Sequence, residues 1–136
     1  MTLLNLPDKN KNGNSPPEIR VLPPSLLRAV AHMERNFSRD IRLPMLAREA
    51  GISKYHLCRV FKRHTGLTPM RFLARLRMER AKALLKEGKN SFSVSMVAAE
   101  VGFNDLGSFI KLFKRATGLT PGEFRKDKDR ASLRLF

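Results

Sequence analysis

The sequence contains one structural unit twice, and this repeat limits the possible folds more than any other feature. Ala47-Arg-Glu-Ala-Gly51-Ile52 recurs as Ala98-Ala-Glu-Val-Gly102-Phe103, and Phe61-Lys-Arg-His-Thr-Gly-Leu-Thr-Pro69 recurs as Phe113-Lys-Arg-Ala-Thr-Gly-Leu-Thr-Pro121. In each copy, a short helical pattern is followed by a glycine, a capping residue (Ser53, and Asn104 or Asp105) and a second helical pattern. Alanine lets two helices approach closely and glycine turns the chain, so each copy predicts a helix-turn-helix.

Helix start and stop signals extend this prediction to the rest of the chain. Pro44, Pro69 and Pro121 each precede an apolar-periodic stretch, and glycines 51, 66, 88, 102 and 118 each follow one. We expect helices at about 25–37, 44–50, 54–65, 69–87, 94–101, 105–117 and 121–126, and no strand. The expected fold is all-α, with one helix-turn-helix at about 44–65, a linker helix at about 69–87 and a second helix-turn-helix at about 94–117.

Two further patterns concern the ends of the chain and the core. Residues 1–24 hold five of the eight prolines and are expected to be a disordered tail or linker stub, and 127–136 a C-terminal tail. The spacing of Leu26, Val30, Met33 and Phe37 predicts one apolar stripe on the first helix. On the linker helix, the predicted apolar side is Phe72, Leu76, Ala83 and Leu84.

The charge of the chain points to a polyanionic partner. The 136 residues carry 27 Lys and Arg against 12 Asp and Glu, a formal net charge of +15. Residues 25–126 hold 21 of the basic and 8 of the acidic side chains, so the charge belongs to the predicted helices and not to a basic tail. Along the linker helix, basic residues outnumber Glu79 and Glu87, and they either reach phosphates or form a solvated face: Arg71, Arg75, Arg77, Arg80, Lys82 and Lys86.

Several function classes are disfavoured by what the sequence lacks. One cysteine and three scattered histidines offer no metal-ligand spacing, and no paired acid and base or phosphate-cradling glycine loop is present. We therefore expect neither an enzyme nor a cofactor. No apolar run approaches the ~20 residues that cross a bilayer, so we expect a soluble protein of the cytoplasm, associated with the nucleoid, and no membrane partner.

The second helix of each repeat has a predicted inner and outer face. On helix 54–65, Leu57, Val60, Phe61 and His64 fall on one side, and Tyr55, Arg59 and Lys62 on the other. Every charge from Ile52 to Arg63 is basic, whereas ordinary solvated helices mix signs; a solvated face is the alternative. On helix 105–117, Phe109, Leu112 and Phe113 fall inward, Gly107, Lys111 and Lys114 outward, and Ser108 and Ile110 on the flanks.

These residues resemble the AraC/XylS family of transcription regulators over about residues 26–126. The resemblance is carried by Leu46-Ala47, Gly51-Ile52-Ser53, Leu57, Phe61-Lys62 and Gly66, by Arg77, Ala81 and Leu84-Leu85, and by Ala98, Gly102-Phe103-Asn104-Asp105, Phe109, Phe113-Lys114, Gly118-Leu119-Thr120-Pro121 and Phe124-Arg125. It implies a bilobed seven-helix DNA-binding domain whose third and sixth helices enter adjacent major grooves.

Carried over residue by residue, the resemblance implies DNA contacts at Tyr55, His56, Cys58, Arg59 and Lys62, and at Leu106, Gly107, Ser108, Ile110, Lys111 and Lys114. Arg63 and Arg115 join them as basic neighbours on the same helices. The second set departs from the family pattern, in which arginine is frequent at Lys111 and a larger side chain at Gly107. Residues 1–24 are too few for the effector domain of many members, so the chain resembles either a short stand-alone regulator or the output domain of a longer one.

The leading hypothesis is a sequence-specific regulator that binds double-stranded DNA, as a monomer if it stands alone, with RNA polymerase as a further candidate partner. The alternative is a non-specific architectural nucleic-acid-binding protein, which the same charge would support.

Overall fold

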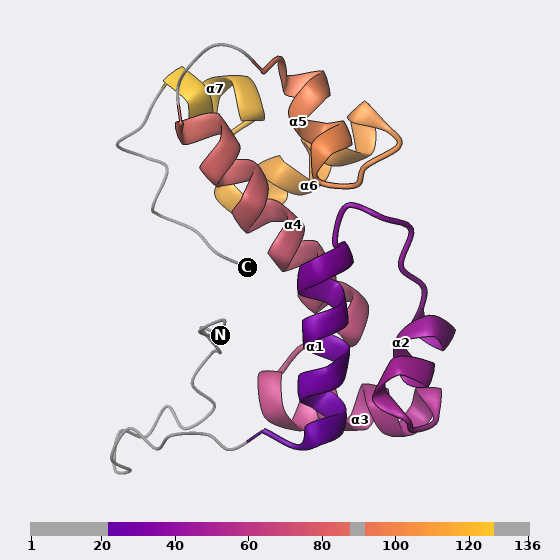
Figure 1. The fold of residues 1–136 in the computed structure, drawn as a ribbon. Helices are drawn as coiled ribbons and strands as arrows, with labels where there is room; N and C mark the ends of the chain where they lie inside the picture. Colours follow the sequence, from indigo (N-terminus) through magenta and orange to yellow (C-terminus); the bar gives the residue numbers. More distant parts are fainter. Residues whose placement is uncertain (1–21, 88–91, 127–136) are drawn as a thin grey trace, which may run out of the picture. The chain divides into compact units, whose positions relative to one another are not determined.

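A computed structural model describes residues 22–87 and 92–126, and within these ranges the chain forms seven α-helices and no β-strand (Figure 1). The helices are α1 (Pro24–Asn36), α2 (Leu43–Ala50), α3 (Lys54–Thr65), α4 (Pro69–Lys86), α5 (Val94–Glu100), α6 (Leu106–Thr117) and α7 (Pro121–Lys126). Each boundary lies within one residue of its prediction, which confirms the all-α fold. The predicted tails fall outside the described residues, except that Leu22 is buried and α1 already begins at Pro24.

The described chain divides into two compact units. Unit 1 consists of the residues up to Arg35 and of Ile41–Phe72; unit 2 consists of Asn36–Asp40 and of the residues from Leu73 onward. In unit 1 most buried side chains come from α1, α2 and α3, joined by Leu22, Ile41 and Phe72. Phe61 packs edge-on against Phe72 of α4, with ring centroids 5.5 Å apart. The predicted stripe of α1 is buried at Leu26, Val30 and Met33.

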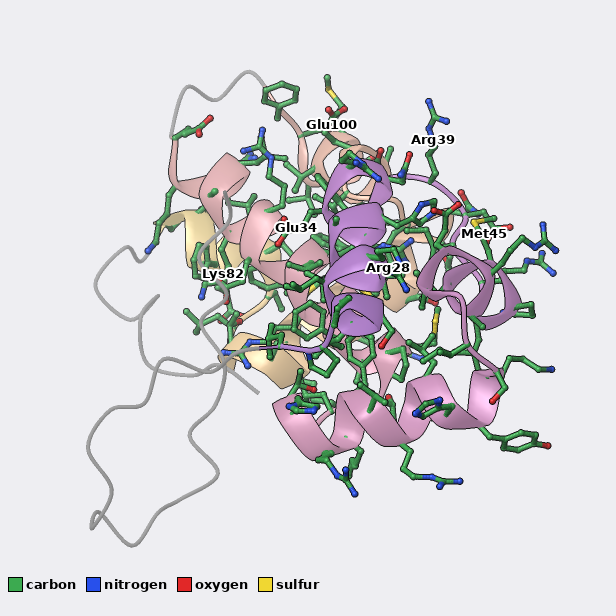
Figure 2. The ribbon with its side chains drawn as sticks, turned by 60° about the horizontal axis from the view of Figure 1, so that its bottom comes forward. Arg28, Glu34, Arg39, Met45, Lys82 and Glu100 are labelled. Carbon is green, nitrogen blue, oxygen red and sulfur yellow. The ribbon has the colours of Figure 1, made fainter. Side chains whose placement is uncertain are left out.

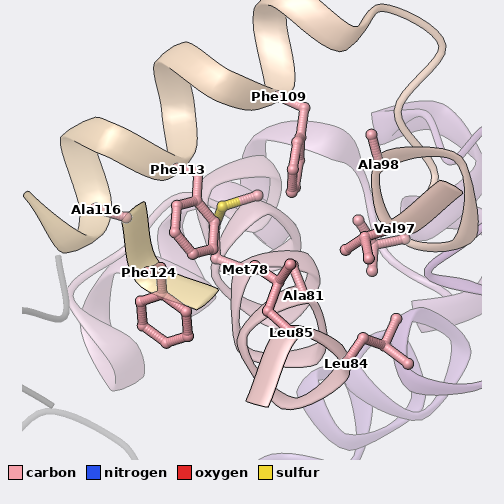
Figure 3. Packing of buried hydrophobic residues seen from close by; sticks show 11 residues of the cluster. Met78, Ala81, Leu84, Leu85, Val97, Ala98, Phe109, Phe113, Ala116 and Phe124 are labelled. Atoms are coloured by element: carbon pink, nitrogen blue, oxygen red, sulfur yellow. The ribbon is translucent and has the colours of Figure 1, made fainter. Parts of the chain in front are cut away.

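The core of unit 2 is built around phenylalanines (Figure 3). Successive ring pairs connect Phe103, Phe109, Phe113 and Phe124, with centroid separations of 5.3, 5.7 and 5.2 Å. Around these rings pack Met78, Ala81, Leu84 and Leu85 of α4 and Val97, Ala98 and Val101 of the α5 region. Edge-to-face pairs of this kind contribute about 0.5–1.5 kcal/mol each beyond the burial of their surface.

Two predicted apolar stripes are wrong in part. Phe37 lies beyond the end of α1 and packs against the core of unit 2. On α4, Leu76 and Ala83 are only half-buried, while Leu73, Met78, Ala81 and Leu85 are almost fully buried. A single stripe does not describe α4 because residues up to Phe72 belong to unit 1 and those from Leu73 onward to unit 2, so one helix serves two cores.

The sequence repeat is also a repeat of hydrogen bonds at the ends of α3 and α6. Thr65 Oγ1 lies 2.7 Å from the Phe61 carbonyl oxygen, and Thr117 Oγ1 lies 2.9 Å from that of Phe113. Each hydroxyl oxygen also accepts from the N–H two residues on, Leu67 at 3.0 Å and Leu119 at 3.1 Å. The glycine that ends each helix, Gly66 or Gly118, has a left-handed conformation, as the sequence predicted.

Candidate nucleic-acid interface

In unit 1, α2, a tight turn and α3 form the first predicted helix-turn-helix. Gly51 adopts φ +75°, and its N–H donates to the Ala47 carbonyl at 2.9 Å. Ser53 caps α3 by accepting from the His56 N–H at 3.1 Å, as predicted. These contacts are local in sequence, which is why the repeat was sufficient to predict them.

Two side chains of α1 hold the first helix of this motif in place. The Arg28 guanidinium, which extends from α1 in Figure 2, donates to the Ala50 carbonyl oxygen at 2.8 Å and so satisfies a carbonyl at the end of α2. His32 Nδ1 lies 4.0 Å from Glu49 Oε2, so this carboxylate is directed to α1. Neither partnership of α1 carries a local sequence signal, since the residues are more than fifteen positions apart.

The structure exposes the predicted outer face of α3. Leu57 and Phe61 are fully buried, and the opposite side of the helix presents long side chains that project away from the rest of unit 1 (Figure 2). Tyr55 is 81% exposed, so its aromatic ring is accessible to a partner on this side of the helix. Cys58 is half-buried, and the remaining candidate contacts of this helix are exposed: His56, Arg59, Lys62 and Arg63.

The second predicted helix-turn-helix, α5, turn and α6, lies entirely in unit 2. Phe109 and Phe113 are fully buried, as predicted, and Leu112 packs partly buried against the same core. The exposed candidate contacts are Leu106, Gly107, Ser108, Lys111, Lys114 and Arg115. Ile110 is half-buried and packs against the core cluster, so less of this side chain faces outward than that of its neighbours.

The cap of α6 brings a carboxylate to the edge of this face. Asp105, one of two caps that the sequence allowed, accepts from the Gly107 and Ser108 N–H groups at 3.2 Å each and from the Ser108 hydroxyl at 2.6 Å. The hydrogen bond from the Ser108 side chain is the largest cause that lowers the pKa of Asp105, followed by those from the two backbone N–H groups, and Lys111 adds a smaller contribution. The hydroxyl proton of Ser108 is therefore used within the protein.

Gly107 is a real gap in the outer face of α6. A Cβ placed on it would meet only the two carboxylate oxygens of Asp105, at 3.6 and 3.8 Å, which are ordinary contacts. The glycine is thus not required by crowding, in contrast to Gly102 in the preceding turn. The two outer faces therefore differ in their side chains and not in the space available to them.

Part of the charge on α4 is already engaged within unit 2. Arg77 donates to the Phe37 and Arg39 carbonyl oxygens at 2.8 and 2.9 Å, and its burial lowers its pKa. Lys82 is nearly buried, with Nζ 3.4 Å from Glu79 Oε1, and Lys86 lies over the Phe124 ring. From the sequence, these residues were expected either to reach phosphates or to form a solvated face. In the structure, Arg77 instead donates to two backbone carbonyl oxygens of its own unit.

Two other classes of site are absent from the described part of the chain. Residues 22–87 and 92–126 contain no cluster of three or more histidine, cysteine or acidic side chains placed to hold a metal ion. In the same residues, no helix is both long and apolar enough to span a bilayer.

Comparison with known proteins gives consistent matches. A family described as helix-turn-helix domain matches residues 46–127. The HTH-type transcriptional activator RhaS of Escherichia fergusonii is 38% identical over 104 residues, which are 76% of this chain and 36% of RhaS. The chain thus spans about a third of the length of the curated relatives it matches. The named relatives regulate transcription, which agrees with the expectation that the chain is not an enzyme.

Two solved structures extend the match to the fold. A probable AraC family transcriptional regulator from Rhodopseudomonas palustris has a TM-score of 0.68 and 29% identity, over 75% of this chain and 94% of that one. The DNA-binding domain of AdpA, a global transcriptional factor solved in complex with a target DNA, has a TM-score of 0.68 and 28% identity, over 75% of this chain and 90% of that one. With its repeated helix-turn-helix and the family match over residues 46–127, this chain belongs to the AraC/XylS family of helix-turn-helix transcription regulators.

Proposed function

We propose that this chain is a sequence-specific transcription regulator that binds double-stranded DNA as a monomer, with α3 and α6 entering adjacent major grooves of one asymmetric site of about 15–20 base pairs. The observation that carries the proposal is the outer face of α3, on which every charged side chain is basic and Tyr55 is 81% exposed. A major groove admits a helix and is bordered by phosphates, which such a face complements. The protein would act at the nucleoid, in the cytoplasm.

On α3, the proposal gives different roles to different side chains. Arg59 is exposed near the middle of the helix, and its planar fork of donors suits the O6 and N7 acceptors of a guanine. Lys62 and Arg63, in the last turn, would contact phosphates, which contribute affinity without sequence information. Tyr55, His56 and Cys58 would complete the face against bases or sugars.

On α6, the proposal predicts affinity more than sequence reading. Lys111, Lys114 and Arg115 are exposed cations, but a lysine is a flexible point charge that serves a phosphate as well as a base. Ser108 can only accept from DNA because its proton is directed to Asp105. Gly107 projects nothing, Leu106 is apolar, and the half-buried Ile110 leaves little surface for a thymine methyl group.

The length of α4 supports a site of two adjacent grooves. Its 18 residues form one continuous helix that belongs to both units, and at 1.5 Å per residue it is about 27 Å long. Successive major grooves on one side of B-DNA are about 34 Å apart. A helical connection of this length is compatible with two readers one helical turn apart on the same DNA. Because the two readers differ, the site needs no two-fold symmetry.

The test is a selection of bound oligonucleotides from a random pool, carried out with the wild type, Arg59→Ala and Arg35→Ala. Arg35 is the matched control, since it is an exposed arginine at the end of α1, while the outer side chains of α3 project away from α1 (Figure 2). We expect an asymmetric consensus that is sharper under α3 than under α6. Arg59→Ala should weaken the binding free energy by about 1–3 kcal/mol and relax the base preference at one or two positions of the consensus. Arg35→Ala should keep the consensus.

Other outcomes would lead to other conclusions. A palindromic consensus would contradict monomeric binding, and equal sharpness in both half-sites would contradict the unequal roles of α3 and α6. If the selected oligonucleotides share no consensus and are bound with the same affinity as random DNA, the result would favour the non-specific architectural alternative. For the electrostatic component, six to ten phosphate contacts imply a log–log salt slope of roughly −5 to −9. A slope shallower than about −2 would mean that the basic faces do not contact DNA.

A further inference from the structure

The path of the chain between α1 and α2 has an unusual feature. Arg35 and Ile41 both belong to unit 1, but the five residues between them, Asn36–Asp40, belong to unit 2. The chain therefore leaves unit 1 after α1, contributes a short segment to the other unit and returns. The chain passes between the two units again within α4, between Phe72 and Leu73. The two units are therefore joined covalently at three places: the two ends of this segment and this point in α4.

Within unit 2, Arg77 makes two hydrogen bonds to the segment Asn36–Asp40. The Arg77 Nε donates to the Phe37 carbonyl oxygen at 2.8 Å, and Nη2 donates to that of Arg39 at 2.9 Å. The same guanidinium lies 5.8 Å from the centroid of the Phe103 ring, in the turn of the second helix-turn-helix. Hydrogen bonds from a charged donor are stronger than neutral ones, and the planar guanidinium holds its donors in fixed directions that match the two carbonyl oxygens.

The segment lies directly against that turn. A Cβ on Gly102 would be 2.8 Å from the Phe37 carbonyl oxygen and 3.1 Å from Ser38 Cα, closer than packing allows. The Phe37 side chain adds a contact with the apolar core of the unit. One arginine of α4 thus binds the connection between α1 and α2 to the turn that precedes α6.

From this arrangement we infer that Arg77 is a positioning residue for DNA recognition, which sets how strictly the chain requires one spacing between its two half-sites. The inference rests on the function proposed above. With the segment bound, unit 2 is attached to unit 1 through α4 and through both ends of the segment. With the segment released, the connection between α1 and α2 no longer restrains unit 2, and the second reader has more freedom relative to the first. Loss of this preorganisation lowers affinity for the best spacing and reduces the discrimination against others.

The test measures affinity for the selected site and for variants with one to three base pairs inserted or deleted between the half-sites. The proteins are the wild type, Arg77→Met, Arg77→Lys and the control Arg80→Met, which removes an exposed arginine from the same helix. For Arg77→Met we expect about a tenfold loss of affinity for the site with the best spacing. Joining two binding modules can raise affinity by about 10²–10⁴-fold, so this is part of that gain. We also expect a flatter spacing profile. Arg77→Lys should resemble Arg77→Met, because a flexible ammonium lacks the fixed fork of donors that holds both carbonyl oxygens. Arg80→Met should keep the shape of the wild-type spacing profile, even if loss of a phosphate contact lowers affinity equally at every spacing.

A second construction tests the inference without altering the core of unit 2. Two glycines inserted after Asn36 and two after Asp40 lengthen the connection while Arg77 remains, and they should flatten the spacing profile in the same way. This insertion decides the matter if circular dichroism shows that Arg77→Met does not fold. A uniform loss at every spacing, or a wild-type profile for the folded variants, would overturn the inference while leaving the proposed function intact. Failure of the wild type to select any site would instead refute the proposed function.

Discussion

Substitution of Gly102 by alanine should be much more harmful than the same change at Gly118, although both glycines have a positive φ, +95° and +83°. At either position alanine costs about 1–2 kcal/mol in left-handed backbone strain. Its smaller unfolded-state entropy returns about 0.4–1 kcal/mol. A Cβ at Gly118 meets nothing within 4 Å, whereas one at Gly102 lies 2.8 Å from the Phe37 carbonyl oxygen. Relief of this overlap requires backbone movement, which typically adds about 1–3 kcal/mol.

We therefore expect the free energy of unfolding to fall by about 1 kcal/mol in Gly118→Ala and by about 2–4 kcal/mol in Gly102→Ala. Both residues belong to unit 2, so the same cooperative unit is compared. Urea unfolding followed by circular dichroism at 222 nm provides the measurement, since the chain has no tryptophan. If the two variants are equal within about 0.5 kcal/mol, the close approach of the Phe37 carbonyl to the turn does not contribute, and the steric argument is refuted.

Four further results are expected. Thr117→Val should lower stability by about 0.5–1.5 kcal/mol in urea unfolding, because the partly buried Leu119 N–H loses its hydrogen bond to the hydroxyl of the buried Thr117; an unchanged midpoint would contradict this. The pKa of Asp105 is lowered in the fold, so its charged cap stabilises the protein above the unfolded pKa of about 3.9, and this contribution is lost as pH falls through the folded pKa. The stability difference between wild type and Asp105→Asn should therefore shrink below about pH 4. A difference that does not depend on pH would refute this. Gly107→Tyr, whose Cβ would make only ordinary contacts with Asp105, should sharpen the half-site under α6; an unchanged consensus would count against the missing side chain as the cause. Lys62→Ala should weaken binding to all sequences about equally and reduce the salt slope by about one, whereas a changed consensus would assign this lysine to a base.

Most of the fold could be predicted from the sequence because its signals are local. Ser53 is a cap, Gly51 turns the chain, and the spacing of Leu57 and Phe61 defines the inner face of α3, all within a dozen residues. The exposed position of Arg59 follows from the same helical period. A repeat adds a second, independent statement of each signal, which is why the helix boundaries could be placed so closely.

What could not be predicted depends on residues far apart in the sequence. Phe37 continues the period of α1, but its side chain packs in the other unit, and no period shows where a helix ends and its chain changes partners. Arg77 is one arginine among several on α4, and only its position near the Phe37 carbonyl distinguishes it. At the candidate site, the donation from Ser108 to Asp105 depends on a rotamer, which composition and spacing do not specify.

The identical hydrogen bonds at the ends of α3 and α6 have a consequence for how such a chain can change its target. Thr65 and Thr117 each join the last turn of their helix, α3 or α6, to the loop that follows it, by hydrogen bonds between the same atoms at nearly the same distances. Neither bond involves the outer face of its helix. The outward residues of one unit could therefore be grafted onto the other without rebuilding the exit of the helix. Under the proposed function, in which α3 and α6 read separate half-sites, such a regulator would acquire a new half-site by surface substitutions alone and keep the other half-site unchanged while it does so.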